Sequence, residues 1–287
     1  MKSFDDKVAA ITGAGSGIGR ALALELAKAK AQLALSDIDG KTVEATAELA
    51  RRFGVRVTTA SLDVAKRAAV HAWADRVVGD YGRVNLVFNN AGVALGSTLE
   101  SVSYEDFEWI MDINFWGVVH GTKAFLPHLR ASGDGHIVNI SSVFGLAAVP
   151  GNGTYNASKF AVRGFTEALR EELDLVRAGV SATCVHPGGI KTNIARSSRL
   201  SAEMETLLGQ DANTARANFE KRFITSPENA ARTILRAVRR NQRRVLIGPD
   251  AKALDILVRL FPSGYQRLIV HQARKELGGT AMSASGP

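Results

Sequence analysis

The sequence predicts an α/β protein in which helices cover both faces of a parallel β-sheet. Across positions 1–190, short β-branched and apolar runs alternate with longer stretches of helical periodicity. The apolar runs are nearly continuous, as expected of strands that are buried on both faces. With 287 residues and 46% apolar composition, the chain is long enough to bury a large core, which favours one domain.

Seven apolar runs are the predicted strands, and a helix near Pro227–Arg240 separates the last two. Crossovers between parallel neighbouring strands are almost always right-handed, so the expected topology is a seven-stranded, doubly wound sheet of the Rossmann type. The predicted strands are Lys7–Thr12, Gln32–Asp37, Arg56–Ser61, Leu86–Asn89, Gly135–Ser141, Val180–His186 and Arg244–Gly248.

The end of the chain departs from this alternation. We expect the main domain to span residues 1–250, with residues 193–225, which are polar, helix-prone and without a strand pattern, forming a lid. Residues 251–287 predict a helical extension whose final stretch, rich in Ser, Gly and Ala, is disordered. The extension could be a subunit interface, a cover over the cleft or a shallow membrane contact, and the interface is favoured.

Positive charge is concentrated in this C-terminal part. From Ser226 onward there are 11 Lys and Arg against 4 Asp and Glu, whereas the chain before Ser226 is nearly neutral. No nucleic-acid-binding module or interleaved aromatic platform accompanies the charge, so nucleic acid is not an expected partner. A solvated helix surface is favoured over a polyanion or membrane contact.

The remaining composition restricts the setting. The single cysteine, Cys184, cannot form an intrachain disulfide, and no apolar stretch approaches the length of a membrane-spanning helix. We read no signal peptide at the N-terminus, so a reducing, cytoplasmic setting is expected. No metal site is predicted.

A glycine-rich turn follows the first predicted strand and precedes a helical run. Glycines let the backbone approach a pyrophosphate, and the helix N-terminus favours its negative charge, although such a turn is also found as a plain strand-to-helix connection. The residues predicted to bind a dinucleotide here are Gly13, Gly15, Ser16, Gly17, Ile18 and Gly19.

Asp37 ends the second predicted strand, close to the interval after Gly19 at which an acid contacts the adenosine ribose. A carboxylate accepts hydrogen bonds from the ribose hydroxyls and repels the 2′-phosphate of NADP by about 1 to 4 kcal/mol at ~4 Å. Neither Ser16 nor Ile38 offers a cation to hold that phosphate, so the cofactor is predicted to be NAD. Alternatively, Asp37 or Asp39 caps the helix beginning near Lys41.

Four further polar residues follow in a fixed order. Tyr155 and Lys159 are spaced i, i+4, so they share one face of a helix. Ser142 ends a predicted strand shortly before Tyr155, and Asn114 lies in a helical segment before that strand. Together with the glycine turn, this order resembles the short-chain dehydrogenase/reductase family over about residues 6–192, and the glycine spacing is not that of its extended branch.

The resemblance implies roles for these and other residues. Tyr155 would be the catalytic acid/base, Lys159 would bind the nicotinamide ribose, Ser142 would bond the substrate oxygen, and Asn114 would hold a water linking Lys159 to solvent. Related enzymes are commonly homodimers or homotetramers. Further cofactor contacts implied by the family motifs are Asp63, Val64, Asn90, Ala91, Gly92, Pro187, Gly188, Ile190 and Thr192.

The chemistry explains why these residue types are needed. Removal of hydride from a secondary alcohol requires a base for the hydroxyl proton, and a phenol with a pKa near 10 is a poor base at neutral pH. Lowering that pKa by three units takes about 4 kcal/mol, at ~1.36 kcal/mol per unit. An ammonium at ~4 Å supplies about that much at an effective dielectric of ~20, so Lys159 is predicted to be sufficient.

The predicted substrate is an uncharged, hydrophobic secondary alcohol or ketone. The neighbours of the catalytic residues are largely apolar and include no obvious Arg or Lys pair for an acidic group. A β-ketoacyl-thioester reductase and a non-catalytic NAD-binding regulator are the alternatives. The predicted pocket residues are Leu95, Val143, Phe144, Val149, Asn152 and Gly189, beside Val93 and Ala94.

Overall fold

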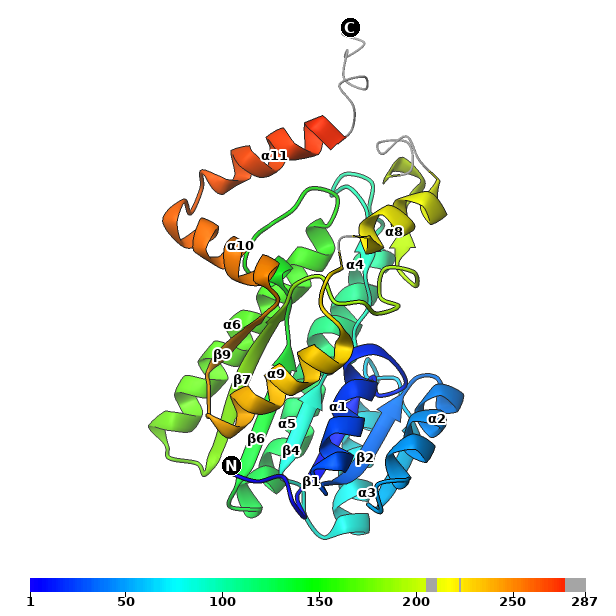
Figure 1. The fold of residues 1–287 in the computed structure, drawn as a ribbon, viewed down its shortest axis with the longest axis vertical. Helices are drawn as coiled ribbons and strands as arrows, with labels where there is room; N and C mark the ends of the chain where they lie inside the picture. Colours follow the sequence, from blue (N-terminus) through cyan, green and yellow to red (C-terminus); the bar gives the residue numbers. More distant parts are fainter. Residues whose placement is uncertain (205–210, 222, 277–287) are drawn as a thin grey trace, which may run out of the picture.

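The computed structural model, which describes residues 1–204, 211–221 and 223–276, contains the predicted seven-stranded parallel sheet (Figure 1). Its strand order is β3-β2-β1-β4-β6-β7-β9, with every pairing parallel. The Rossmann-type topology is confirmed, and each predicted strand agrees with the structure to within one residue at either end. The strands are β1 Val8–Thr12, β2 Gln32–Asp37, β3 Val57–Ser61, β4 Leu86–Asn89, β6 Gly135–Ile140, β7 Val180–Pro187 and β9 Arg244–Ile247.

Helices cover both faces of the sheet and divide the core into two layers. Alternation along β1 sends Ala9 and Ile11 into one layer and Val8 and Ala10 into the other. One layer is closed by α1 Gly17–Lys28, α2 Gly40–Arg51 and α9 Pro227–Arg239. The other is closed by α3 Arg67–Tyr81, α5 Gly117–Ala131 and α6 Gly153–Leu175.

A second sheet of two very short strands has one of its strands in the predicted lid region. β8 (Arg199–Leu200) pairs in parallel with β5 (Leu95–Gly96), so the expectation that residues 193–225 contain no strand is wrong. Two residues are too few to show an alternating pattern, and such a strand is defined only by its pairing with another strand. The described part of this region also contains α8, Ala212–Glu220, whereas residues 205–210 and 222 lie outside the described residues.

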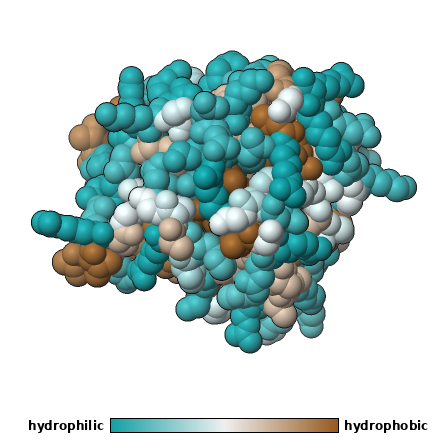
Figure 2. All heavy atoms as spheres, turned by 90° about the horizontal axis from the view of Figure 1, so that it is seen from below, coloured by the Kyte–Doolittle hydropathy of each residue, from teal (hydrophilic) through white to brown (hydrophobic). Residues whose placement is uncertain are grey.

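The C-terminal extension consists of α10 (Pro249–Leu260) and α11 (Tyr265–Glu276). Both lie beyond the carboxyl ends of the strands, on the side that also carries α8 (Figure 1). The opposite side of the molecule presents a mostly hydrophilic surface (Figure 2). The predicted disordered tail falls on residues 277–287, outside the described residues. Among the helices described, none is both long and apolar enough to span a membrane.

Candidate active site

The glycine turn joins β1 to α1 tightly, and at Gly13 and Gly19 there is no room for a side chain. Gly13 has a φ of +64°, and a Cβ on it would lie 2.8 Å from Cα of Ala91. A Cβ on Gly19 would lie 2.1 Å from the carbonyl oxygen of Gly13. Ser16, the N-cap of α1, is exposed and makes no side-chain capping hydrogen bond. The turn therefore leaves a bare backbone cradle and a free hydroxyl at a helix N-terminus, which suits a pyrophosphate.

Asp37 ends β2 directly beside this turn. Its Oδ2 accepts a hydrogen bond from the Gly15 N–H at 2.9 Å, and its Oδ1 accepts one from the Asp39 N–H at 3.1 Å. The cap of α2 is Asp39, which accepts from the N–H groups of Lys41 and Thr42. The capping alternative therefore applies to Asp39, while the Asp37 carboxylate faces the glycine turn, where the ribose of a dinucleotide would lie.

Arg20 is a neighbour of this site that sequence reasoning missed. Its guanidinium donates to the carbonyl of Gly15 and, at 3.0 Å, to Thr46 Oγ1. A cation therefore contacts the same residue whose N–H bonds Asp37. Inspection of Ser16 and Ile38 alone could not find it, because Arg20 reaches back across the first turn of α1.

The residues that follow β4 are hydrogen-bonded to the end of β1 and to the same turn. Thr12 Oγ1 accepts from the N–H groups of Asn90 and Ala91 at 3.0 and 3.1 Å, and the Asn90 amide donates to the carbonyls of Thr12 and Gly13. The Asn90 side chain therefore fixes β4 to the glycine turn. Its neighbour Gly92 is exposed, and a Cβ on it would approach both Asn114 and Lys159.

Three more of the predicted cofactor residues lie in different positions around the site. Asp63 accepts from the Ala65 N–H at 2.9 Å, in the turn that precedes α3. Val64 is buried against Gly117, so its side chain belongs to the core and only its backbone could contact a ligand. Thr192 lies opposite the glycine turn, since a Cβ on Gly17 would be 3.0 Å from its methyl carbon.

The segment after β7 is held by the first turn of α10. Asp250, in the first turn of α10, accepts the Gly189 N–H at 2.6 Å, and a Cβ on Gly188 would lie 2.1 Å from its Oδ2. Pro187 and Gly188 run beside Ile247 of β9. Sequence reasoning missed Asp250 because no local pattern connects it to a loop so much earlier in the chain.

Ser142 and Tyr155 meet at the carboxyl end of β6. Ser142 is buried, its Oγ accepts the Phe144 N–H at 3.1 Å, and its hydroxyl is close enough to Tyr155 to affect the pKa of the phenol. Burial raises the pKa of Tyr155 to about 12, and the Ser142 hydroxyl only partly opposes this rise. Ser141 is instead structural, since its hydroxyl donates to the carbonyl of Lys159 at 2.8 Å.

Lys159 lies one helical turn along α6 from Tyr155. Its Nζ is 5.6 Å from the centre of the Tyr155 ring and donates to the Ile140 carbonyl at 3.1 Å. Burial lowers the pKa of Lys159 to about 8. Burial therefore opposes the lowering of the phenol pKa that is expected from this ammonium, because the ammonium is itself desolvated.

Asn114 is fully buried in a π-helical turn, Asp112–Trp116, that follows α4 (Tyr104–Met111). Its side chain accepts the Val93 N–H at 2.8 Å and donates to the Val93 carbonyl and to Ser158 Oγ. Both amide hydrogens of Asn114 are therefore engaged in hydrogen bonds, and the side chain holds the backbone of Val93 in place beside Gly92. Such π-turns interrupt α-helices frequently at functional sites.

Asn156 organises the loop after Ser142, a role that sequence reasoning missed. It accepts the Val149 N–H at 3.2 Å and donates to the carbonyls of Phe144 and Ala147 at 2.9 and 3.0 Å. The loop carries Phe144, whose ring meets that of Tyr155 edge-on at 5.9 Å. The position of Asn156 next to Tyr155 was the one available signal.

The predicted pocket residues come from three segments that the structure brings together. Leu95 is buried in β5, and Ser97 after it forms a bridge with Asn152. The region of β8 covers these segments, because Met204 packs on Gly151 and the Leu200 side chain on Gly96. Arg199 anchors β8 by stacking on Trp109 at 3.7 Å and bonding Asp106.

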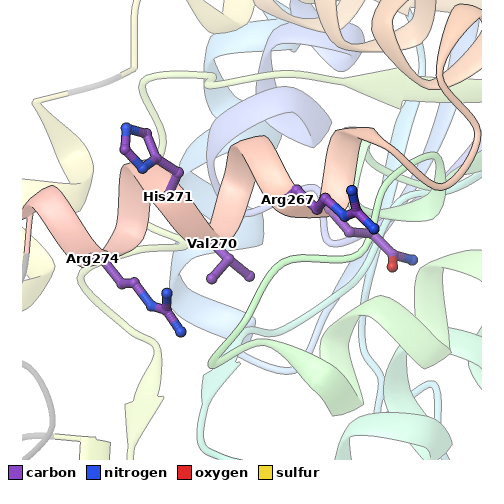
Figure 3. A pocket seen from close by; sticks show the side chains of 5 residues that line it. Arg267, Val270, His271 and Arg274 are labelled. Carbon is purple, nitrogen blue, oxygen red and sulfur yellow. The ribbon is translucent and has the colours of Figure 1, made fainter. Parts of the chain in front are cut away.

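The C-terminal extension reaches the same loop. The hydroxyl of the buried Tyr265 accepts the Ala148 N–H at 3.2 Å, so α11 begins beside the loop that Asn156 organises. A cavity of about 400 Å³ lies along α11, where Arg267, Val270 and Arg274 project from one side and His271 from the other (Figure 3). Its described lining contains no predicted pocket residue.

Comparisons with known proteins show the family of the chain. Residues 7–203 match the family model described as short chain dehydrogenase. The chain is 54% identical to the putative oxidoreductase SadH of Mycobacterium tuberculosis over 270 residues, covering 94% of this chain and 96% of SadH. The chain therefore belongs to the short-chain dehydrogenase family and is an oxidoreductase of that family.

Solved structures support the same assignment. A short-chain dehydrogenase/reductase from Burkholderia phymatum, crystallised in complex with NAD, is 32% identical with a TM-score of 0.84, covering 91% of this chain and 96% of that one. Levodione reductase is 29% identical with a TM-score of 0.76, covering 87% of this chain and 99% of that one. Both likenesses extend over most of the chain.

Proposed function

We propose that this protein is an NAD-dependent dehydrogenase that interconverts a hydrophobic secondary alcohol and its ketone. The observation that carries the proposal is the convergence of Ser142 and Lys159 on Tyr155, at the end of the sheet where the glycine turn lies. A protein that only bound a dinucleotide would have no use for a phenol, a hydroxyl and an ammonium in this arrangement.

The protein's own residues would handle the proton. Tyr155 would take the hydroxyl proton of the alcohol, and Ser142 would hold the same oxygen in place by a hydrogen bond. Lys159 would stabilise the phenolate. Asn114 would hold the loop after β4 in place beside Lys159. A bound NAD⁺ would supply the acceptor for the hydride of the carbinol carbon and, until it is reduced, a positive charge near the phenol.

The bare backbone at Gly13 and Gly19 and the Asp37 carboxylate at Gly15 fit a dinucleotide with a free adenosine ribose. We propose NAD for this reason, and the NAD complex of the related Burkholderia phymatum structure supports it. The apolar surroundings of Tyr155, with Phe144 against its ring, support an uncharged substrate. The neighbour named levodione reductase, by that name a reductase of a dione, supports a carbonyl compound as the oxidised substrate.

The test is a rate screen with the purified protein. We expect reduction of NAD⁺ with one or more aryl, alicyclic or steroid-like secondary alcohols, and slower reaction with NADP⁺. Tyr155→Phe should keep the affinity for NAD, measured by fluorescence titration. Its turnover rate should fall about 10²–10⁴-fold. Activity confined to acidic or phosphorylated substrates would refute the substrate class, and full turnover of the Tyr155→Phe variant would refute the mechanism.

A further inference from the structure

A cationic groove lies on the surface between α9, the edge strand β9 and α10. Its volume is about 440 Å³. The charged side chains that line it are Arg236, Arg240, Arg244, Lys252, Arg259 and Asp255. Five cations therefore surround one acid, and none of the proposed catalytic residues is among the described lining.

The single acid is already engaged. Asp255 forms ion pairs with Arg244 at 2.5 Å and with Arg259 at 3.0 Å. No ion pair with a described acid is formed by Arg236, Arg240 or Lys252. The two arginines at the end of α9 have i, i+4 spacing and so repel each other on the same helix face. An anion in the groove would relieve this repulsion.

Apolar side chains border the groove on α10. Ile256 and Leu260 are 57% and 67% exposed, and helical spacing places them on the same outward face as Lys252 and Arg259. The other acid of α10, Asp250, is directed inward to Gly189. The outer surface of α10 therefore combines cations with exposed apolar groups and offers no free carboxylate among its residues.

We propose that this surface docks on an anionic lipid membrane, with headgroup phosphates in the groove and Ile256 and Leu260 inserted at the level of the headgroups. Basic and apolar groups on one helical face are the combination that binds such interfaces. A second copy of the chain fits less well, because a twofold interface would place this patch against itself and bring cations together. For this surface the proposal differs from the subunit interface that the sequence alone favours.

Docking would also orient the molecule. α10 is followed by Tyr265, which contacts the loop at Ala148 beside the proposed active site. A membrane under α10 would place that loop near the bilayer, from which an apolar substrate could partition. This consequence rests on the proposed function, whereas the docking itself does not.

The experiment is co-sedimentation of the full chain with vesicles. We expect binding to phosphatidylcholine vesicles that contain phosphatidylglycerol, little binding to phosphatidylcholine alone, and weakening by salt. Replacing two surface cations in Arg236→Gln/Arg240→Gln should lower the partition coefficient about thirtyfold. Ile256→Ser/Leu260→Ser should lower it about tenfold or more. The matched control is Leu175→Ser/Arg177→Gln, an exposed apolar and cationic pair at the far end of α6, which should bind like the wild type.

Several results would overturn the proposal. They are absence of vesicle binding, equal binding to neutral and anionic vesicles, and full binding by both groove and apolar variants that circular dichroism shows to be folded. Loss of binding in inorganic phosphate, but not in chloride of equal ionic strength, would assign the groove to a free phosphate. Conversion of a dimer to a monomer by Ile256→Ser/Leu260→Ser, measured by sedimentation velocity, would assign the surface to a second copy.

Discussion

Tyr155 and Lys159 have pKa values that burial moves in opposite directions. The pKa of the phenol is raised to about 12 and that of the ammonium is lowered to about 8, since both neutral forms are favoured where water is excluded. Alcohol oxidation needs the phenolate, whose population rises tenfold per pH unit below its pKa. Ketone reduction needs the protonated phenol, which is available throughout the neutral range.

We therefore expect kcat/KM for alcohol oxidation to rise with pH, and Lys159→Met to move the midpoint of that rise to higher pH. The physical reason is that this variant removes the cation facing the phenol ring. Steady-state rates measured across pH with both proteins check this. An unchanged midpoint in the folded variant would show that Lys159 does not act on the phenol.

We expect Asp37 and Arg20 together to determine whether the site accepts the 2′-phosphate of NADP. The carboxylate bonds the Gly15 N–H, and the guanidinium bonds the carbonyl of the same residue. Asp37→Ser would remove the repulsion and leave the cation in place. We expect the preference for NAD over NADP to fall by about tenfold or more, since like charges at ~4 Å cost about 1 to 4 kcal/mol.

The matched variant is Asp37→Ser/Arg20→Gln. In it the gain in kcat/KM with NADP should be lost, because no cation remains beside Gly15. Ratios of kcat/KM for the two cofactors measure both effects. If the two variants show the same ratio, Arg20 does not contribute to cofactor choice.

At the scale of elements, the site depends on α10, which lies outside the region matched by the family model. Asp250 ties the first turn of α10 to Gly189, in the segment predicted to contact the nicotinamide. Asp250→Ala would leave the Gly189 N–H without its acceptor and free the loop. We expect a rise of about tenfold in the Kd for NAD, corresponding to ~1.4 kcal/mol, close to the lower end of the range for a hydrogen bond to a charged group.

Lys252→Ala, half a turn further along α10, is the control and should leave the Kd unchanged. Titration of intrinsic fluorescence with NAD measures both variants. Unchanged NAD affinity in Asp250→Ala would mean that the contact between α10 and Gly189 is unnecessary for cofactor binding. Cofactor binding would then be independent of this contact with α10.

The elements differ in how well the sequence predicts them, for physical reasons. The strands of the main sheet were predictable because most are buried on both faces and so are continuous apolar runs. β5 and β8 were not, since strands this short exist only through their pairing. The order of Ser142, Tyr155 and Lys159 predicted their convergence. The contacts of Arg20 and Asp250 could not be predicted, because no local sequence pattern connects the segments that these contacts join.

For the whole molecule, two buried histidines make folding sensitive to acid. His136 bonds Thr183 at 2.8 Å, and His186 bonds the Ser142 carbonyl at 3.0 Å. Burial lowers the pKa of His136 to about 3 and that of His186 to about 4. Between these values and the ordinary value of ~6.5, the unfolded chain binds more protons than the folded one, so stability is lost as pH falls through this window.

At pH ~5 each histidine should cost about 2 kcal/mol of unfolding free energy relative to pH ~7, at ~1.36 kcal/mol per unit, or about 4 kcal/mol together. Urea unfolding at the two pH values measures the loss. His136→Gln/His186→Gln should be less stable at neutral pH but should lose much less between the two, because no imidazole remains to be charged. The exposed His71→Gln is the control and should keep the wild-type difference. If the double variant loses as much stability on acidification as the wild type, the loss comes from the carboxylates. The two imidazoles would then have the same protonation in the folded and unfolded states over this pH range.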